Sequence, residues 1–362
     1  MLVNNSANNK ETILSLQDAK VHFKSGSGKN KLVVKAVDGV NFEIYKGEIF
    51  GLVGESGCGK TTTGRAMIRL NELTDGKIEF LGQSIVEGTE TDYRNLKISK
   101  KKLIRAKSVD EKEAIKKEIA ELKTEIDRKK KLNAKVDRNL MQNMQMIFQD
   151  PIASLDPRMT VKEIIAEGLR IMGEKNDEVI TQKVNEMLKV VGLVPEHGNR
   201  YPHEFSGGQR QRIGIARALI LNPKFLIADE PISALDVSIQ AQIINLLNDL
   251  RADYDLTILF VAHDLSVVKY FSDRIGVMYF GHLVELAESD ELFANPIHPY
   301  TKSLLSAVPL PDPRYEKRRT RIIYDAQQTH DYSKEQPMMH EIKPGHFVRA
   351  NTEELDRYRS EL

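Results

Sequence analysis

The chain has 362 residues, of which 41% are hydrophobic and 29% charged, and its formal net charge at pH 7 is +1. This composition is typical of a globular protein with a real core and room for about two domains, and it excludes a global field that would attract nucleic acid. The single cysteine, Cys58, excludes an intrachain disulfide and a cysteine-ligated metal or iron–sulfur site within one chain, and it favours a reducing compartment.

The first part of the chain predicts strands rather than a targeting segment. Residues 1–10 lack the apolar region of a signal peptide, and no apolar run approaches the ~20 residues that span a bilayer, so contact with a membrane would need another chain. Three strand patterns, separated by Gly and Asp-Gly turns, precede a helix that should run from Lys60 to about Leu70. Strands are predicted at 13–23, 33–44, 48–54 and, as a hairpin, at 76–85.

Residues 94–140 differ sharply from their surroundings. They contain 17 Lys and Arg against 8 Asp and Glu, a local charge of +9, and they predict a charged helical hairpin. The helix seam has the heptad spacing 4, 3, 4 at Ile115, Ile119, Leu122 and Ile126. Asp110 and Glu113 match a capping box at its start. The hairpin is either a solvated insertion or a contact for anionic lipid or for an acidic face of a partner.

The remainder of the chain alternates strands and helices. Helices are predicted at 160–192, 206–220 and 240–250, and buried strands at 144–148, 225–231 and 258–264. Alternating strands and helices, with polar residues where strands end, predict an α/β sheet that binds a ligand at its carboxyl edge. The last fifty residues are charged and only weakly periodic.

The stretch "GESGCGKTTTG" at 54–64 matches the pattern G-x-x-x-x-G-K-[ST] between a predicted strand and a predicted helix. Its glycines let backbone N–H groups curl around a phosphate chain, Lys60 should reach the β- and γ-phosphates, and Thr61 should ligate Mg²⁺. Cys58 would contribute its backbone N–H, with a redox role as the alternative. The predicted phosphate-binding residues are Gly54, Glu55, Ser56, Gly57, Cys58, Gly59, Lys60, Thr61 and Thr62.

Two acids end the predicted strand "FLIADE" at 225–230. Asp229 would hold Mg²⁺ directly or through water. Glu230 would polarise the water that attacks the γ-phosphate, as a general base must lie within hydrogen-bond reach of the nucleophile. The alternative is an acidic strand end that only caps a turn, but the phosphate loop favours the catalytic interpretation.

The stretch "FSGGQRQR" at 205–212 resembles the signature of the ABC ATPases, with Phe205 in place of the usual Leu. The resemblance implies that this helix start clamps the γ-phosphate of a nucleotide on a partner subunit. The residues implied are Ser206, Gly207, Gly208 and Gln209.

Other marks of this family follow in its order. Gln149 matches the family's glutamine that senses Mg²⁺ and the attacking water. His263 matches the switch histidine that contacts the γ-phosphate. Asp236 matches the aspartate that lies at the seam between the two subunits of the dimer. Thr61, Gln149 and Asp229 are the implied Mg²⁺ ligands. Phe23 matches the aromatic residue that stacks on adenine, and a place in the core is the competing interpretation.

Longer segments, such as "MIFQDPIASLDPRMTV" and "NPIHPYTKSLLSAVPLPDP", resemble the oligopeptide/dipeptide importer ATPases. The resemblance implies an α/β fold: a RecA-like P-loop NTPase core of the ABC type with an inserted α-helical subdomain, the extra charged hairpin and a C-terminal extension. The expected parts are the first core segment (11–92), the hairpin (93–140), a core strand with the glutamine loop (141–150), the helical subdomain (151–220), the second core segment (221–293) and the extension (294–362).

The implied function is ATP hydrolysis, with Mg²⁺ and without an iron–sulfur cluster, that drives oligopeptide or dipeptide uptake. The implied partners are a sister ATP-binding subunit, two transmembrane permeases and an extracellular or periplasmic peptide-binding protein, which would place the chain on the cytoplasmic face of the membrane. The alternatives are a soluble ABC ATPase of translation or DNA repair, an importer of another solute such as nickel, and a nucleotide-binding scaffold without turnover. A chromosome-type ABC ATPase is disfavoured because its coiled coil follows the glutamine corresponding to Gln149 and is much longer.

Overall fold

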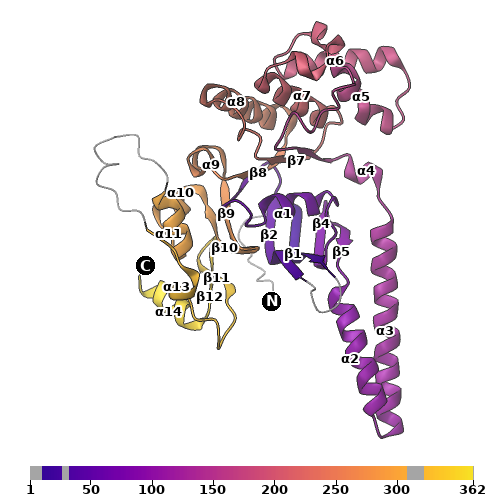
Figure 1. Ribbon diagram of the computed structural model, residues 1–362, viewed down its shortest axis with the longest axis vertical. Coiled ribbons are helices and arrows are strands. Elements are labelled where there is room, and N and C mark those ends of the chain that lie inside the picture. The colour runs from indigo at the N-terminus through magenta and orange to yellow at the C-terminus, as the bar shows by residue number, and fades with distance from the viewer. Residues whose placement is uncertain (1–9, 27–31, 308–321, 362) are drawn as a thin grey trace.

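The computed structural model describes residues 10–26, 32–307 and 322–361. Parts of the sequence analysis concern the amino-terminal segment and the "VPLPDP" segment, which lie outside these residues, as do residues 27–31. Two sheets form the centre of the molecule, with a helical region at one end, a long helical hairpin at the other and the C-terminal region to the side (Figure 1). Among the described helices, none combines the length and apolar character needed to cross a bilayer.

The larger sheet has eight strands in the order β11-β12-β10-β9-β3-β8-β7-β6. The strands from β9 to β6 run parallel, whereas β10, β12 and β11 extend the sheet antiparallel. Every residue of β3, β7 and β8 is buried, as expected of parallel strands covered on both faces. The bounds are β3 (Ile49–Val53), β6 (Met144–Ile147), β7 (Phe225–Asp229), β8 (Thr257–Ala262), β9 (Arg274–Tyr279), β10 (His282–Glu288), β11 (Met338–Lys343) and β12 (His346–Ala350).

The smaller sheet is antiparallel, in the order β2-β1-β4-β5, and packs on one face of the larger sheet together with helix α1 (Lys60–Met67). Helices cover the other face. Strand β3 shows both contacts, because Phe50 and Leu52 join the core under the small sheet, while Ile49 and Val53 join the core under the helices. The strands are β1 (Thr12–Ser25), β2 (Leu32–Tyr45), β4 (Asp75–Phe80) and β5 (Gln83–Glu87).

The helical region contains two helices where the sequence predicted one continuous helical stretch at 160–192. The break follows from local signals: Gly173 has φ 98, and Asn176 caps the second helix by accepting hydrogen bonds from the backbone of Glu178 and Val179. The helices of this face are α5 (Val161–Ile171), α6 (Asp177–Val190), η2 (Pro195–Asn199), η3 (Pro202–Glu204), α7 (Gly207–Leu219), α8 (Val237–Tyr254) and α9 (Leu265–Phe271).

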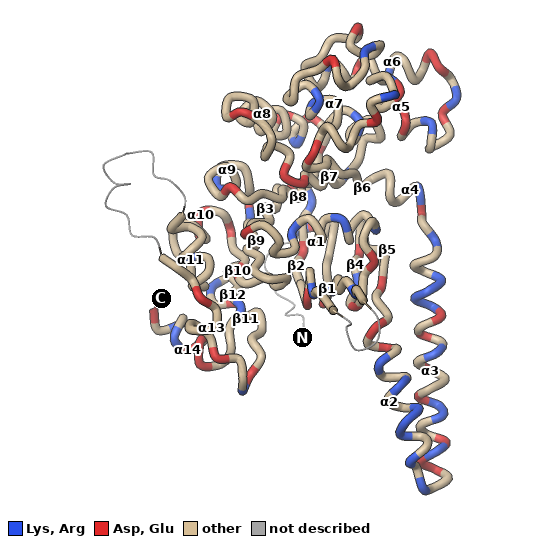
Figure 2. The backbone as a smooth tube through the Cα atoms, in the orientation of Figure 1, with Lys and Arg blue, Asp and Glu red and all other residues tan. Residues whose placement is uncertain are grey.

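Helices α2 (Glu90–Arg105) and α3 (Val109–Ala134) form a long antiparallel hairpin that projects from the small sheet, and α4 (Arg138–Met141) returns the chain to β6 (Figures 1 and 2). The predicted seam residues Ile115, Ile119 and Ile126 are buried against α2. The predicted capping box at Asp110 is wrong, because α3 begins two residues earlier and Ser108 accepts the capping hydrogen bond from the Glu111 N–H.

The C-terminal region continues the larger sheet rather than forming a separate unit. Strands β12 and β11 pair in order beyond β10, although the last fifty residues showed only weak periodicity. Buried Glu285 on β10 accepts hydrogen bonds from the backbone N–H groups of Ile297 and His298 and contacts His346 Nε2 at 2.8 Å. The helices here are α10 (Ser289–Ala294), α11 (Pro299–Ser306), α13 (Ala326–Thr329) and α14 (Thr352–Ser360).

Two histidines, buried His298 and partly buried His282, make the stability of this fold dependent on pH. Burial lowers the pKa of His298 from 6.5 to about 3 and the pKa of His282 to about 4. Below pH 6.5 the unfolded chain therefore binds protons that the folded chain excludes, so the free energy of unfolding must fall as the pH falls. We expect a loss of about 2–3 kcal/mol between about pH 7.5 and pH 5.5, measured by urea unfolding. Equal stability at the two pH values would contradict this assignment.

Candidate functional site

The predicted phosphate loop lies where β3 ends and α1 begins, at the carboxyl edge of the parallel strands. Three of its glycines have positive φ: 147 at Gly54, 81 at Gly57 and 109 at Gly59, the N-cap of α1. L-residues rarely adopt these angles, so the loop can curl only with glycine at these positions. The backbone thereby turns back on itself directly before a helix N-terminus, which is the geometry that binds anions.

Close packing by the rest of the fold gives a second reason for two of these glycines. A Cβ on Gly54 would lie 2.2 Å from the Met278 carbonyl oxygen, and a Cβ on Gly59 would lie 2.2 Å from that of Ala36. A Cβ on Gly57 would meet nothing within 4 Å. Strands β9 and β2 therefore press on the two ends of the loop, while its middle remains open.

Lys60 is buried, and its ammonium lies inside the loop. Its Nζ donates to the Gly54 carbonyl at 2.7 Å and to the Glu55 carbonyl at 2.9 Å. The Cys58 thiol is buried beside it, and burial raises the pKa of this thiol, which keeps it protonated and unreactive. The geometry gives the loop one central cation and no thiolate.

A second pair of side chains joins α1 to the end of β7. The Thr61 hydroxyl donates to Asp229 Oδ1 at 2.8 Å, and the other carboxylate oxygen, Oδ2, is buried without a hydrogen-bond partner. Burial raises the pKa of the Asp229 carboxyl against the opposing effect of the Thr61 hydroxyl. A buried oxygen without a partner beside a hydroxyl is an oxygen-rich site with unused capacity to bind a hard cation.

Three side chains that the sequence singled out separately meet at Glu230. Gln149 Nε2 donates to Glu230 Oε2 at 2.9 Å, and His263 Nδ1 lies 3.2 Å from the same oxygen. These residues follow strands β6, β7 and β8, which end side by side at one sheet edge. Glu230 adopts φ 44, an uncommon angle for a non-glycine residue, and such backbone strain is concentrated at functional sites.

The "SGGQ" stretch opens α7 as a capping box. Ser206 Oγ accepts from the Gln209 N–H, and Gln209 Oε1 accepts from the Ser206 N–H. A Cβ on Gly208 would lie 2.6 Å from the Ile239 side chain, so α8 requires a glycine there. Within the described residues, no hydrogen bond links these side chains to the phosphate loop or to Glu230. Phe205 is buried against the edge of His197, so the departure from the usual Leu fills the core.

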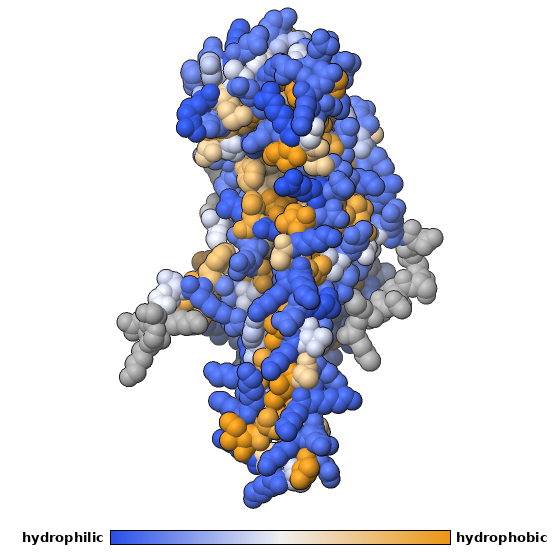
Figure 3. Space-filling model, turned by 90° about the vertical axis from the view of Figure 1, so that its right-hand side faces the viewer, coloured by the Kyte–Doolittle hydropathy of each residue, from blue (hydrophilic) through white to orange (hydrophobic). Residues whose placement is uncertain are grey.

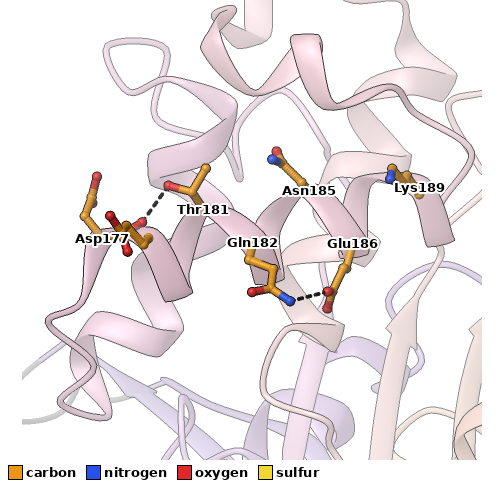
Figure 4. Close-up of a pocket in the computed structure, with 7 residues that line it drawn as sticks. Asp177, Thr181, Gln182, Asn185, Glu186 and Lys189 are labelled. Atoms are coloured by element: carbon orange, nitrogen blue, oxygen red, sulfur yellow. Dashed lines mark hydrogen bonds between the residues drawn. The ribbon is translucent and has the colours of Figure 1, made fainter.

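Phe23 and Asp236 lie apart from these clusters. Asp236 is the exposed N-cap of α8. Phe23 is 47% exposed, which argues against a place in the core, and it lines a groove of about 930 Å³ between β1, the segment after α1 and the start of α2. A second hollow of about 580 Å³ is the solvent face of α6 alone, where Gln182 donates to Glu186 (Figure 4), and it contains none of the predicted residues.

Sequence reasoning missed one contact at the loop. The Glu55 N–H donates to the Tyr300 hydroxyl oxygen at 3.0 Å, and Tyr300 on α11 is 2% exposed. Its ring packs against Tyr279 and Tyr324, which continue into the C-terminal region. The "HPYT" segment at 298–301 resembles the family, but no nearby sequence pattern predicts this hydrogen bond, because 245 residues separate Glu55 from Tyr300.

We expect Tyr300→Phe to raise the KM for ATP about fivefold with kcat changed less than about twofold, because one hydrogen bond that positions the loop, of about 1 kcal/mol, is removed. Steady-state hydrolysis and equilibrium nucleotide binding measure both values. Tyr358→Phe is the matched control, since the Tyr358 hydroxyl is buried in the same region without a partner. An equal effect of both variants would show that the loop does not depend on Tyr300.

Family models match two parts of the chain. The model described as "ABC transporter" matches residues 37–142 and 102–233, and the model described as "Oligopeptide/dipeptide transporter, C-terminal region" matches residues 284–334. The matched parts contain the phosphate loop, Gln149, the start of α7, Glu230 and Tyr300.

Relatives of known family match nearly the whole chain. The oligopeptide transport ATP-binding protein OppF of Bacillus subtilis is 53% identical over 349 residues, which are 96% of this chain and 99% of the relative. OppF of Streptococcus pyogenes and AmiF of Streptococcus pneumoniae are each 49% identical, over 97% of this chain and 99% of each relative.

Solved structures share the fold. The dimeric ATP-binding cassette MJ0796 bound to ADP and Pi has a TM-score of 0.57 at 24% identity and covers 76% of this chain and 99% of its own. CbiO1 of Clostridium perfringens has a TM-score of 0.55 at 23% identity, over 79% and 92%. The predicted α/β cassette fold and the family resemblance are thereby confirmed: the chain belongs to the ABC transporter ATP-binding proteins of the oligopeptide/dipeptide transporter family.

Proposed function

We propose that this chain binds and hydrolyses ATP as a subunit of an ABC importer of oligopeptides. The observation that carries the proposal is the meeting of Gln149 and His263 on one carboxylate oxygen of Glu230, at the sheet edge that also bears the phosphate loop. A carboxylate placed in this way can take a proton from water and orient it, with an amide and an imidazole fixing its direction.

The loop would hold the triphosphate through its backbone N–H groups from Gly54 to Thr62, with Lys60 exchanging its carbonyl partners for the β- and γ-phosphates. His263 would contact the γ-phosphate and Gln149 the attacking water. Catalysis would then depend mainly on position and charge stabilisation, as in other phosphoryl transfers.

The site fits Mg²⁺. Thr61 and Asp229, whose Oδ2 has no hydrogen-bond partner, would hold the ion together with Gln149. When bound, Mg²⁺ would neutralise charge on the β- and γ-phosphates. We propose no iron–sulfur cluster, since Cys58 is the only cysteine.

We further propose that the site is completed by a second ATP-binding subunit. Ser206, Gly207, Gly208 and Gln209 would clamp the γ-phosphate on that partner, which is consistent with the absence, among the described residues, of any hydrogen bond from them to the phosphate loop of their own chain. Asp236, exposed at the start of α8, would lie at the dimer seam, and half-exposed Phe23 would stack on adenine. Closure of the dimer on ATP would be the work step, because the closed state contacts the nucleotide better than the open one.

The proposed assembly contains a sister ATP-binding subunit, two permease chains that dock near Gln149, and a peptide-binding protein outside the cell. The chain would lie on the cytoplasmic face of the membrane. We retain the expected parts: core segments at 11–92, 141–150 and 221–293, the hairpin at 93–140, the helical subdomain at 151–220 and the extension at 294–362.

Purification of the tagged chain from detergent-solubilised membranes, followed by mass spectrometry and peptide uptake in vesicles, tests this proposal. Two permease chains and a second ATP-binding chain should copurify, and uptake should require ATP and a peptide-loaded binding protein. Glu230→Gln is the matched control, which should assemble equally and fail to transport. Recovery of ribosomes or DNA, or uptake of nickel instead of peptide, would refute the assignment.

A further inference from the structure

The end of the helical hairpin, residues 97–112, which we call the hairpin tip, is an unpaired cationic cluster. All of its cations are exposed, and none of them forms an ion pair in the described part of the chain, whereas its only acids are Asp110 and Glu111. The cations are Lys97, Lys100, Lys101, Lys102, Arg105, Lys107 and Lys112. Figure 2 shows that basic residues continue along the hairpin to its tip. These cations therefore form no ion pair that joins α2 to α3 in the described part of the chain.

Aliphatic side chains are exposed among these cations. Ile104 is 85% exposed and Val109 is 73% exposed, on the two sides of the turn, and Ile98 is 45% exposed one turn and a half away. Figure 3 shows this hydrophobic surface at the end of the hairpin, surrounded by hydrophilic residues. Aliphatic side chains exposed among lysines form an amphipathic surface of the kind that binds at a membrane interface.

The other end of the hairpin is firmly anchored. Arg128 pairs with Glu87 of β5, and Lys129 pairs with Asp92. Asn133 closes the joint, because its side chain donates to the Glu87 carbonyl and accepts from the Glu87 N–H. With about 39 Å of helix in α3, the tip is held at a fixed distance from the body rather than on a loose tether.

We propose that the hairpin tip contacts the anionic surface of a lipid bilayer, with its lysines at the headgroups and Ile104 and Val109 inserted between them. The proposal rests on the proposed function, which places the chain beside a membrane. Helix α3 leads through α4 and β6 to Gln149, so the base of the hairpin is joined to the proposed permease dock, and the tip projects away from the helical region (Figure 1).

The chemistry favours lipid over other polyanions. Six of the seven cations are Lys, which bind headgroup phosphates as flexible point charges, whereas nucleic-acid sites favour Arg forks and aromatic stacking. Exposed aliphatic side chains gain by entering the acyl boundary but gain nothing from a phosphate backbone. The alternative partner of the hairpin tip is an acidic protein surface. Absence of binding to anionic vesicles would favour that partner over lipid.

The test is cosedimentation of the purified full chain with vesicles of phosphatidylcholine alone or mixed with phosphatidylglycerol. We expect binding only to the mixed vesicles, weakened by high salt. Reversal of Lys100, Lys101 and Lys102 to Glu should weaken it about 100-fold, since each basic residue near such a surface contributes about fivefold. Ile104→Ser with Val109→Ser should weaken it several-fold at unchanged charge.

The matched control reverses Lys175, Lys183 and Lys189 of the helical region, which are also exposed and form no ion pair with any residue that the structure describes, and it should change binding less than about threefold. Equal loss in both triple variants, or no binding to anionic vesicles, would overturn the proposal. ATP hydrolysis by the same preparations separates the two hypotheses: an active ATPase that ignores vesicles refutes only the lipid contact, and vesicle binding by an inactive chain refutes only the proposed activity.

Discussion

Replacing Glu230 by Gln should lower ATP hydrolysis at least about 100-fold while nucleotide binding stays within about threefold of the original. The amide keeps the size of the side chain but cannot accept a proton from the attacking water. Gln149 Nε2 can still donate to the remaining oxygen, so the geometry should survive. Phosphate release under saturating ATP and equilibrium binding of a labelled nucleotide measure the two quantities independently.

Glu288→Gln is the control for loss of one carboxylate, because Glu288 is exposed on β10 and its side chain forms no hydrogen bond within the described part of the chain. It should leave both quantities unchanged. Hydrolysis that persists in Glu230→Gln, with normal binding, would mean that another group activates the water and that the Gln149–Glu230–His263 cluster is structural.

Replacing Lys60 by Met should weaken ATP binding about 10- to 100-fold and abolish most turnover. A hydrogen bond to a charged group contributes about 1.5–3 kcal/mol, which corresponds to this range of dissociation constants. The buried ammonium also holds the Gly54 and Glu55 carbonyls, so the loop should lose order. Titration with a fluorescent nucleotide and thermal unfolding, each with and without ATP, measure both effects.

Lys183→Met on the solvent face of α6 is the matched change at an exposed site without an ion pair, and it should bind ATP normally. If Lys60→Met binds ATP as tightly as the original chain, the lysine only fastens the loop, and the backbone N–H groups must supply the affinity.

The residues of the candidate site were predictable where the signal is local. A strand that ends in Asp229 and Glu230, or a glycine pattern directly before Lys60, is a short stretch whose chemistry depends on its immediate neighbours. The meeting of Gln149, Glu230 and His263 followed from the parallel order of their strands, since carboxyl ends of such strands lie at one edge.

The contact between the phosphate loop and the C-terminal region was not predictable. Nothing near Glu55 or Tyr300 indicates that a backbone N–H of one will donate to the hydroxyl of the other. The predicted start of α3 was wrong for a different reason. Ser108 and Asp110 are both good N-cap residues, and only the packing of α3 against α2 decides between them. Strand β11 gave little signal because no residue of this edge strand is fully buried. Strand β12 gave little signal because its buried positions include polar His346, whereas Phe347 is only partly buried.

The left-handed backbone at Glu230 sets the stability of the fold against the proposed catalytic role of this residue. A glycine there would relax the chain by about 1 kcal/mol and leave β7 easier to fold. Folding alone would therefore select against an acid at this position, and the proposed chemistry alone requires one. Glu230, the proposed general base, is therefore also a residue that destabilises the fold locally. The neighbouring strands hold its strained backbone in place.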